Sequence, residues 1–217
     1  MRITWRTELP HWVLLVILLA LLLIAPPQSM PIHWNLDGQP DRSADKWVVM
    51  ALAGGLYLAL VLLPRLDPGR ANYAQFSGAY STIRLAVLTL VMVLTGSSIF
   101  GLRGAEVTHL AIGAMLIVIG SVLGKIRPNW FVGIRTPWTL TSKRSWLKTH
   151  RLGGWLFMAW GFLELLTGPV LPGGRAVTLV YGGAVLAILV ICSYVVWRDD
   201  LDKLPAVGTQ PANGTRS

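Results

Sequence analysis

Long apolar runs, separated by short gaps of charged, Gly and Pro residues, constrain this 217-residue chain more than any other feature. Hydrophobic residues make up 53% of the chain and charged residues only 13%, whereas soluble domains carry about 25% charged residues. The remaining charge lies in the gaps, as it does in chains that cross a lipid bilayer. The sequence therefore predicts an all-α integral membrane protein without a separate soluble domain.

Six of the apolar runs are long enough to cross the bilayer as helices, and we therefore predict six transmembrane helices. These runs cover residues 9–25, 47–63, 83–102, 108–124, 152–166 and 176–197. The first run follows a basic start and resembles a signal peptide, but Pro26 and Pro27 come next without a small-x-small cleavage pattern. That arrangement favours a retained membrane anchor.

The gaps between the runs define the expected domains. We expect an N-terminal two-helix unit over residues 1–70, which contains an external loop at 26–46. A four-helix unit over 71–200 follows, with a cytoplasmic loop at 125–151. Residues 201–217 lack apolar periodicity and are predicted to form a disordered tail.

The distribution of Lys and Arg predicts the orientation, because basic residues concentrate in cytoplasmic segments. With the N-terminus inside, the cytoplasmic segments hold all but four of the 19 Lys and Arg residues, the exceptions being Arg42, Lys46, Arg103 and Arg175. Arg84 is counted among the cytoplasmic residues. Both termini are therefore predicted to be cytoplasmic. This asymmetry also explains the net charge of +9, so direct nucleic-acid binding is not expected.

The external loop is the first concentration of polar and aromatic residues. Its candidate binding residues are His33, Trp34, Asn35, Asp37, Gly38, Asp41 and Lys46. One interpretation is a cation site, in which His33 and Asp37 act together with Glu106 and His109, although the spacing matches no known zinc or calcium pattern. The other is turn formation at residues 35–38 with anchoring by the flanking tryptophans. We predict no bound metal and no cofactor.

The cytoplasmic loop is the second concentration, with seven basic residues, no acidic residue and three tryptophans within residues 125–154. Ser142 is suited to cap a short helix starting near Lys143, which would place Trp146 and His150 on one face. Such a loop can rest on anionic lipid headgroups. The fixed order of Gly133, Pro137 and the later glycine pair also indicates a folded recognition surface, and the two interpretations are compatible.

Two stretches of the chain resemble known sequence families. Pro128-Asn-Trp-Phe-Val-Gly-Ile-Arg-Thr-Pro-Trp-Thr-Leu140, followed by Trp146 and Thr149-His-Arg-Leu-Gly-Gly154, resembles the signature of the SdpI family of bacterial immunity membrane proteins. Met30-Pro-Ile-His-Trp-Asn-Leu-Asp-Gly38, with Asp41 and Lys46, is similar to the uncharacterised domain that often precedes it. Together the two resemblances cover most of residues 10–197.

The resemblance implies protection of a cell against a secreted antimicrobial peptide toxin. It also implies signalling, since the family's namesake captures a small autorepressor at the membrane. The candidate residues of the cytoplasmic motif are Asn129, Gly133, Arg135, Thr136, Pro137, Trp138, Trp146, His150, Arg151 and Gly154. The family often has acidic residues where this chain has Lys143 and Arg144, which makes the expected inner face more basic.

Glu164 is the one carboxylate expected deep inside a span, and such a group is a candidate functional residue. It either pairs with His109 or is protonated in a polar pocket, or it lies close enough to the outer interface to reach water. Glu164 is also the best argument for a rival function as a small transporter or channel. A membrane-bound hydrolase is a weaker rival, because the sequence has no HExxH or GxSxG motif. Cys192 is the single cysteine, so no intrachain disulfide can form.

Overall fold

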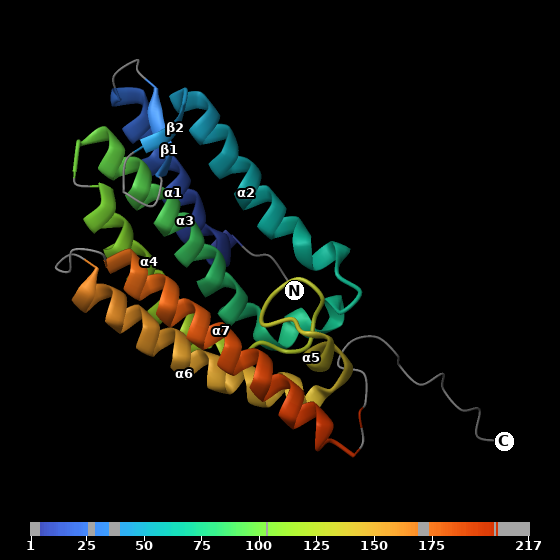
Figure 1. Ribbon diagram of the computed structural model, residues 1–217. Helices are drawn as coiled ribbons and strands as arrows, with labels where there is room; N and C mark the ends of the chain where they lie inside the picture. Colours follow the sequence, from blue (N-terminus) through green and yellow to red (C-terminus); the bar gives the residue numbers. More distant parts are fainter. Residues whose placement is uncertain are drawn as a thin grey trace.

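The computed structural model describes residues 5–25, 29–34, 40–102, 104–168, 174–201 and 203, which form an elongated bundle of helices (Figure 1). Within these residues the long helices are α1 (Trp5–Ile24), α2 (Lys46–Leu66), α3 (Ser77–Ile99), α4 (Gly104–Leu123), α6 (Lys143–Thr167) and α7 (Gly174–Arg198). The shorter elements are the strands β1 (Met30–Trp34) and β2 (Pro40–Ala44), the 3-10 helix η1 (Arg70–Phe76) and the helix α5 (Pro137–Thr141). The predicted disordered tail lies outside the described residues, apart from Leu201 and Lys203.

Five helical segments among the described residues are long and apolar enough to cross a membrane: Thr7–Ile24, Lys46–Leu66, Arg70–Ile99, Glu106–Leu123 and Thr178–Arg198. The chain is therefore a multi-pass membrane protein. Helix α6 has 25 residues but is not in this set. Its first turns carry the exposed basic residues Lys143, Arg144, Lys148 and Arg151, which lower its mean hydropathy.

Helix α2 continues past Pro64 to Leu66, although the apolar run predicted from the sequence ended at residue 63. A proline has no backbone N–H, so the carbonyl of Leu60, one turn earlier, loses its helical donor. The hydroxyl of Tyr80 on α3 donates to the Leu60 carbonyl instead. This contact explains how the helix runs on to Leu66 without leaving a buried carbonyl unpaired.

The expectation of an all-α chain needs one correction, because the predicted external loop contains a two-stranded antiparallel sheet. Strand β1 pairs with β2 from Met30 opposite Ala44 to Trp34 opposite Pro40, with two irregularities in register. Asp45 then caps α2 by accepting a hydrogen bond from the Trp47 N–H at 2.8 Å. The hairpin thus leads directly into the capped start of α2.

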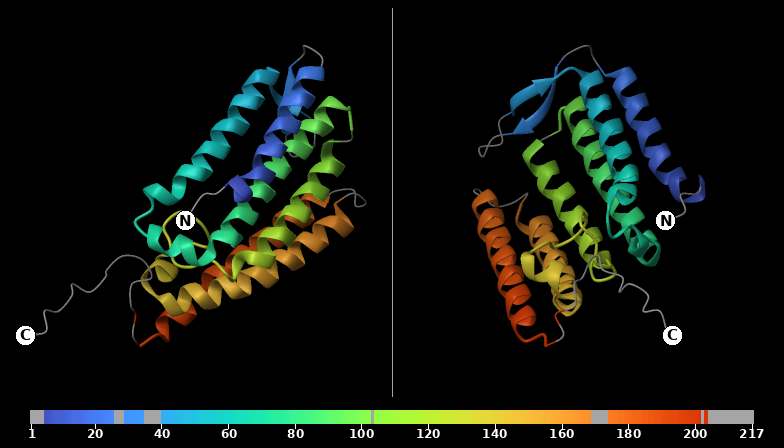
Figure 2. Two further views of the ribbon diagram at one scale, coloured as in Figure 1. Left: turned by 180° about the vertical axis from the view of Figure 1, so that it is seen from behind. Right: turned by 90° about the vertical axis from the view of Figure 1, so that its right-hand side faces the viewer.

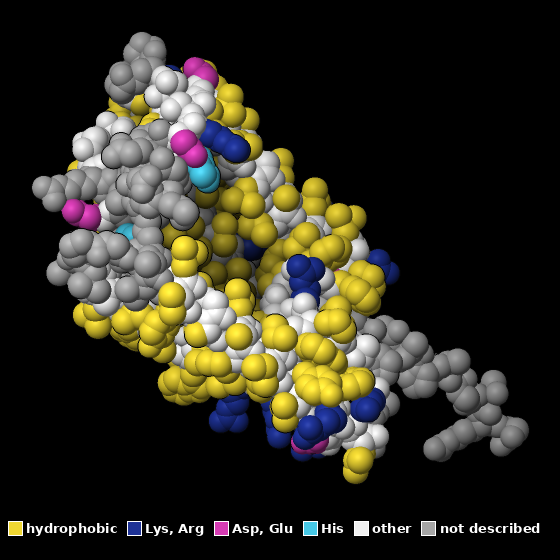
Figure 3. Space-filling view, in the orientation of Figure 1, with side chains coloured by type: hydrophobic (Ala, Val, Ile, Leu, Met, Phe, Trp, Pro, Cys, Tyr) yellow, Lys and Arg dark blue, Asp and Glu magenta, His cyan; other side chains and the backbone are white. Residues whose placement is uncertain are grey.

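The helices stand in a row with the hairpin at one end of the bundle and residues 124–142 at the other (Figures 1 and 2). We call residues 124–142 the motif loop, and the two ends the hairpin end and the loop end. Helices α1, α2 and α3 pack together, and the row continues through α4, α6 and α7. Hydrophobic side chains cover much of the face in Figure 3, while Lys and Arg gather mainly toward the loop end.

Helices α4 and α6 cross at very close range, because each has glycines spaced seven residues apart. A methyl group on Gly120 would lie 2.7 Å from the Gly154 carbonyl oxygen, and one on Gly161 would lie 2.5 Å from the Gly113 carbonyl oxygen. Both distances are shorter than van der Waals contact. A spacing of seven residues returns to the same helix face, so the two pairs hold α4 and α6 antiparallel along two full turns.

We expect Gly120→Ala to lower the free energy of unfolding by about 1–3 kcal/mol, because overpacking forces the backbones apart. Thermal unfolding of the purified protein in mild detergent would measure the loss. Gly55→Ala on α2 is the matched control, since no atom lies within 4 Å of the added carbon. Its stability should be unchanged or higher by roughly 0.5–1 kcal/mol, and equal losses in both variants would contradict the close contact.

Candidate functional site

Asn129 organises the first turn of the motif loop and is fully buried. Its side-chain oxygen accepts hydrogen bonds from the N–H groups of Phe131 at 3.0 Å and Val132 at 2.6 Å. Its amide nitrogen donates to the carbonyls of Arg127 and Val132, both at 2.9 Å. Asn129 therefore replaces the regular hydrogen bonds that this irregular segment lacks.

His150 fixes the next part of the loop. Its ring stacks on Trp146, with centroids 4.1 Å apart, as their spacing on one helix face predicted. The Ile134 N–H donates to His150 Nε2 at 2.9 Å, so Nδ1 carries the ring proton and donates to the Trp146 carbonyl at 2.8 Å. Gly133 has a φ of 120°, and a side chain there would collide with the His150 ring. Only glycine fits this position.

Burial of His150 determines its protonation state. The ring lies before the apolar stretch 152–166, and desolvation lowers the pKa of His150 to about 4. The imidazole is therefore neutral at pH 7, which agrees with its role as an acceptor at Nε2. His150 is thus a structural support for the motif loop, and a proton on Nε2 would break its bond to Ile134.

The second half of the motif loop docks on α6 and α7. Thr136 caps the short helix α5 in a capping box with Thr139, and Pro137 occupies its first turn. The Thr136 hydroxyl donates to the Ser193 hydroxyl on α7 at 3.0 Å. The ring of Trp138 meets Tyr194 edge-on at 5.2 Å. Ser142 then caps α6 as predicted, although this helix continues to Thr167 rather than being short.

The predicted motif residues divide into a buried set and an exposed set. Asn129, Thr136, Trp146, His150 and Gly154 are buried and build the loop. Gly133, Arg135, Pro137 and Arg151 are exposed, and Trp138 is half-buried. Arg135 donates to the Trp130 carbonyl at 2.7 Å, beside the partly exposed rings of Trp130 and Phe131. These exposed side chains are the ones available to a partner.

Asp67 was not singled out from the sequence, yet it joins the N-terminal helices to the motif loop. Its carboxylate is buried and accepts hydrogen bonds from the Gly69 N–H at 2.6 Å and the Tyr73 hydroxyl at 2.8 Å. The Trp130 N–H donates to both of its oxygens, at 3.0 and 3.2 Å. The Asn72 side chain also donates to the Pro128 carbonyl at 2.7 Å. The only sequence feature that pointed to a structural role for Asp67 was its position just after an apolar span.

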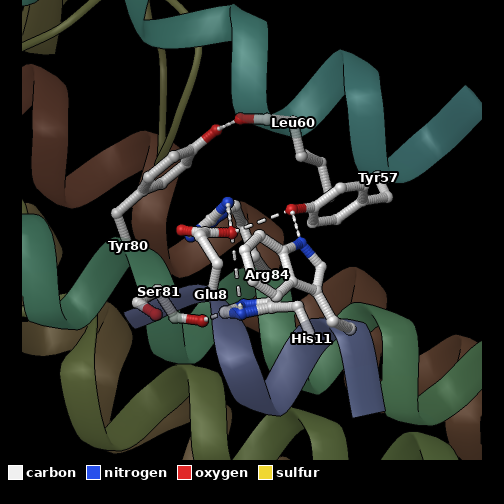
Figure 4. Close-up of polar contacts among 8 residues, drawn as sticks. Glu8, His11, Tyr57, Leu60, Tyr80, Ser81 and Arg84 are labelled. Atoms are coloured by element: carbon white, nitrogen blue, oxygen red, sulfur yellow. Dashed lines mark hydrogen bonds and ion pairs between the residues drawn. The ribbon is translucent and has the colours of Figure 1, made fainter. Parts of the chain in front are cut away.

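A second unpredicted cluster lies among α1, α2 and α3 (Figure 4). Arg84 on α3 was expected in a cytoplasmic segment, but it is buried and forms two hydrogen bonds with Glu8 on α1, at 2.6 and 3.0 Å. Tyr57 on α2 donates to Glu8 at 3.1 Å and accepts from the Trp12 indole at 2.8 Å. An arginine inside an apolar run is the sequence feature that could have predicted this cluster, since such a charge requires a partner.

His11 completes this cluster from the next turn of α1. Its Nε2 lies 3.3 Å from the Ser81 carbonyl, and its Nδ1 lies 3.9 Å from Glu8. The cluster therefore links three helices through one carboxylate. A buried ion pair contributes little net stability when intact, but loss of one partner leaves an unpaired charge and costs several kcal/mol.

Glu164 on α6 is buried, so the alternative in which it reaches water is wrong. One carboxylate oxygen lies 2.8 Å from His109 Nδ1 on α4, and the other accepts from the Trp160 indole at 2.9 Å. The predicted proximity of Glu164 and His109 is thus present. The pair lies at the hairpin end of the contact between α4 and α6.

The hairpin residues are only partly described. His33 and Asp41 form an exposed hydrogen bond of 2.5 Å, which holds the pKa of the Asp41 carboxyl below its usual range. Lys46 donates to the Ala25 carbonyl at 2.9 Å and ties the end of α1 to α2. Asn35, Asp37, Gly38 and the side chain of Trp34 lie outside the described residues. In the described part, no three His, Cys, Asp or Glu residues gather as a metal site would require.

We predict that the loop end loses stability in acid. His150 has a pKa of about 4 when folded and an ordinary value of 6.5, so its contribution is complete above about pH 6.5 and is lost as the pH falls through 4. This contribution is about 3 kcal/mol. Unfolding at pH 7 and pH 4.5 should show a smaller pH dependence in His150→Gln than in the wild type. His33→Gln, at an exposed histidine, should keep the full dependence between pH 7 and 4.5, because the Asp41 carboxyl that His33 contacts titrates below this range. The same reduction in both variants would contradict the assignment of the pH dependence to His150.

We also predict that Glu8→Gln lowers the free energy of unfolding by about 3–5 kcal/mol, because it leaves the Arg84 guanidinium buried without a counter-charge. Asp199→Asn is the matched control. It removes one partner of the Arg198–Asp199 pair, whose side chains are 60% and 58% exposed, and should cost under about 1 kcal/mol. Chemical unfolding in detergent measures both variants. Equally small losses would show that Glu8 and Arg84 are not a buried pair.

Comparisons with known proteins agree with the resemblance seen in the sequence. Residues 125–195 match the SdpI/YfhL protein family, and residues 12–66 match a domain of unknown function (DUF1648). Immunity protein SdpI of Bacillus subtilis (strain 168) is 21% identical over 141 residues, which cover 63% of this chain and 68% of that relative. No solved structure matches the chain. The motif loop and most of helices α6 and α7 therefore form a segment similar to the SdpI/YfhL protein family, and a match to DUF1648 lies on its N-terminal side.

Proposed function

We propose that this chain is an immunity protein of the bacterial cell membrane, which gives resistance to a secreted antimicrobial peptide toxin. The observation that carries the proposal is the family match over the motif loop, α6 and α7, together with a relative named immunity protein. In this proposal the toxin meets the hairpin, whose exposed His33 and Asp41 lie at the opposite end of the bundle from the motif loop. The proposal includes no enzymatic step.

The proposed topology has six transmembrane helices, with both termini and the motif loop in the cytoplasm. Helix α6 is the proposed sixth span: its apolar residues 152–166 lie in the bilayer, and its first turns, with their exposed basic residues, lie at the cytoplasmic surface. It runs antiparallel to α4 along the glycine contacts. The basic residues around the loop end favour the cytoplasmic side. Residues 1–70 and 71–200 are the proposed two-helix and four-helix units.

The motif loop is the proposed contact for a cytoplasmic partner, a small autorepressor protein. Its support is the combination of a rigid, hydrogen-bonded core with the exposed side chains of Trp130, Phe131 and Arg135. Aromatic residues and arginine are enriched at the energetic centres of protein interfaces. The basic residues Lys143 and Lys148 nearby favour an acidic partner surface.

Transport is the second candidate, and the Glu164–His109 pair is the observation that favours it. A buried carboxylate beside a histidine inside a helix bundle is a common arrangement in proton relays. Ion or proton flux into liposomes that contain the purified protein would support this rival. Immunity without measurable flux would leave the pair as a structural contact between α4 and α6.

The test of immunity is survival of toxin-sensitive bacteria that express the full chain, challenged with culture supernatant of a toxin-producing strain. We expect at least tenfold higher survival than in cells with an empty vector, since a membrane-resident binder removes the peptide before it acts. Survival at the vector level, with the protein present in the membrane fraction, would overturn the proposal.

Two variants separate protection from signalling. Survival of challenged cells measures protection, and the amount of repressor in the membrane fraction measures signalling. Arg135→Ala should keep protection and lose repressor recruitment to the membrane, because Arg135 is exposed on the motif loop. Arg70→Ala is the control, since Arg70 is an exposed arginine at the loop end outside the motif. If Arg135→Ala removes the protein from the membrane, Arg135 has a structural role instead.

A further inference from the structure

An apolar cavity of about 220 Å³ lies beneath the hairpin, between β1, α2 and α3. Its floor and walls include Ala53 on α2 and Val91 on α3, and Ile32 of β1 lies at its outer end. Thr95 is the one polar residue among those that line it. Figure 3 shows a yellow-lined hollow below the hairpin, with Lys or Arg, Asp or Glu, and His side chains together at its upper rim.

The position of the cavity determines what can fill it. The residues of α2 and α3 that line it belong to segments apolar enough to lie in the hydrocarbon of the bilayer. Water is excluded, because a water molecule needs two to four polar partners and an apolar cavity stays dry. Ile32 and Leu52 line the cavity and are 41% and 59% exposed, so its mouth faces the surroundings of the bundle.

The size and the rim of the cavity point to the same occupant. An engineered apolar cavity of about 150 Å³ is large enough to bind benzene, so this one accommodates a longer hydrocarbon segment. Arg42 pairs with His33 in the hairpin register, directly after Ile32, and it is exposed. Asp41, the neighbour of Arg42, is hydrogen-bonded to His33. The hairpin thus carries an exposed basic group one residue from the part of β1 that lines the cavity, and such a group can hold the phosphate of a lipid whose acyl chain fills the cavity.

We propose that this cavity is a phospholipid site, in which one acyl chain from the leaflet on the hairpin side fills the space between β1, α2 and α3. The phosphate lies beside Arg42 at the rim. The lipid completes the packing of α2, which has few buried residues of its own. This site is separate from the proposed immunity function and does not depend on it.

Photo-crosslinking of the full-length protein in bilayer nanodiscs tests the site directly. The probe is phosphatidylglycerol with a diazirine in its acyl chain, and mass spectrometry locates the labelled residues. We expect label at Leu52, Ala53 and Val91 that excess unlabelled phosphatidylglycerol reduces at least threefold. Val16 on α1, which is 65% exposed outside the cavity, should give weak and non-saturable label. Equal, non-saturable labelling at all four positions would overturn the proposal.

Two pairs of variants sharpen this result. Ala53→Leu fills the cavity and should reduce the saturable label at Val91 at least threefold, whereas Ala51→Leu, at an exposed position of α2, should not. Arg42→Gln should weaken competition by phosphatidylglycerol, whereas Arg70→Gln at the loop end should not. If Ala53→Leu folds and abolishes toxin protection but leaves the label unchanged, the cavity holds an apolar peptide side chain and the lipid proposal is wrong.

Discussion

The close contact between α4 and α6 is the constraint on which the C-terminal part of the structure depends. Glycines of each helix contact the backbone of the other helix at two positions along their length, so the two helices approach more closely than larger side chains would allow. At one end the contact brings His109 to Glu164, and at the other it places Trp146 where its indole donates to the Ile126 carbonyl at 3.0 Å. The motif loop can then close over His150. One packing geometry therefore positions both the buried pair and the loop.

Polar contacts, in addition to apolar packing, attach the N-terminal helices to this frame. Glu8 and Arg84 join α1 to α3 inside the bundle, and Asp67 joins the end of α2 to the backbone of Trp130. In hydrocarbon an unpaired polar group costs several kcal/mol. These polar contacts therefore select one arrangement of the helices, which apolar contacts between helices do not. These contacts join the helices that contain the DUF1648 match to the SdpI-like segment, although each is recognised separately in the sequence.

The sequence predicted those parts of the structure that depend on local pattern. Apolar runs predicted the helices, Ser142 the start of α6, and a spacing of four the stacking of Trp146 on His150. It did not predict the hairpin, because β1 and β2 contain Pro and charged residues and lack clear alternation. It also missed Asp67 and the Glu8–Arg84 pair. Their partners lie 63 and 76 residues away along the chain, and no local pattern encodes such a distance. The functional roles of the hairpin and motif residues stay predictions.

The Glu8–Arg84 pair has a consequence for how the protein enters the membrane. An arginine at the centre of a newly inserted helix costs about 2.5–3.5 kcal/mol on insertion scales, and Arg84 lies two turns into α3, near the middle of the apolar segment Arg70–Ile99. The carboxylate that neutralises it belongs to α1, which is synthesised earlier. Helix α1 must therefore stay close to the insertion site until α3 arrives, rather than diffuse away in the bilayer. The order of synthesis thus supplies the counter-charge before it is needed, and assembly of the bundle starts with its first and third helices.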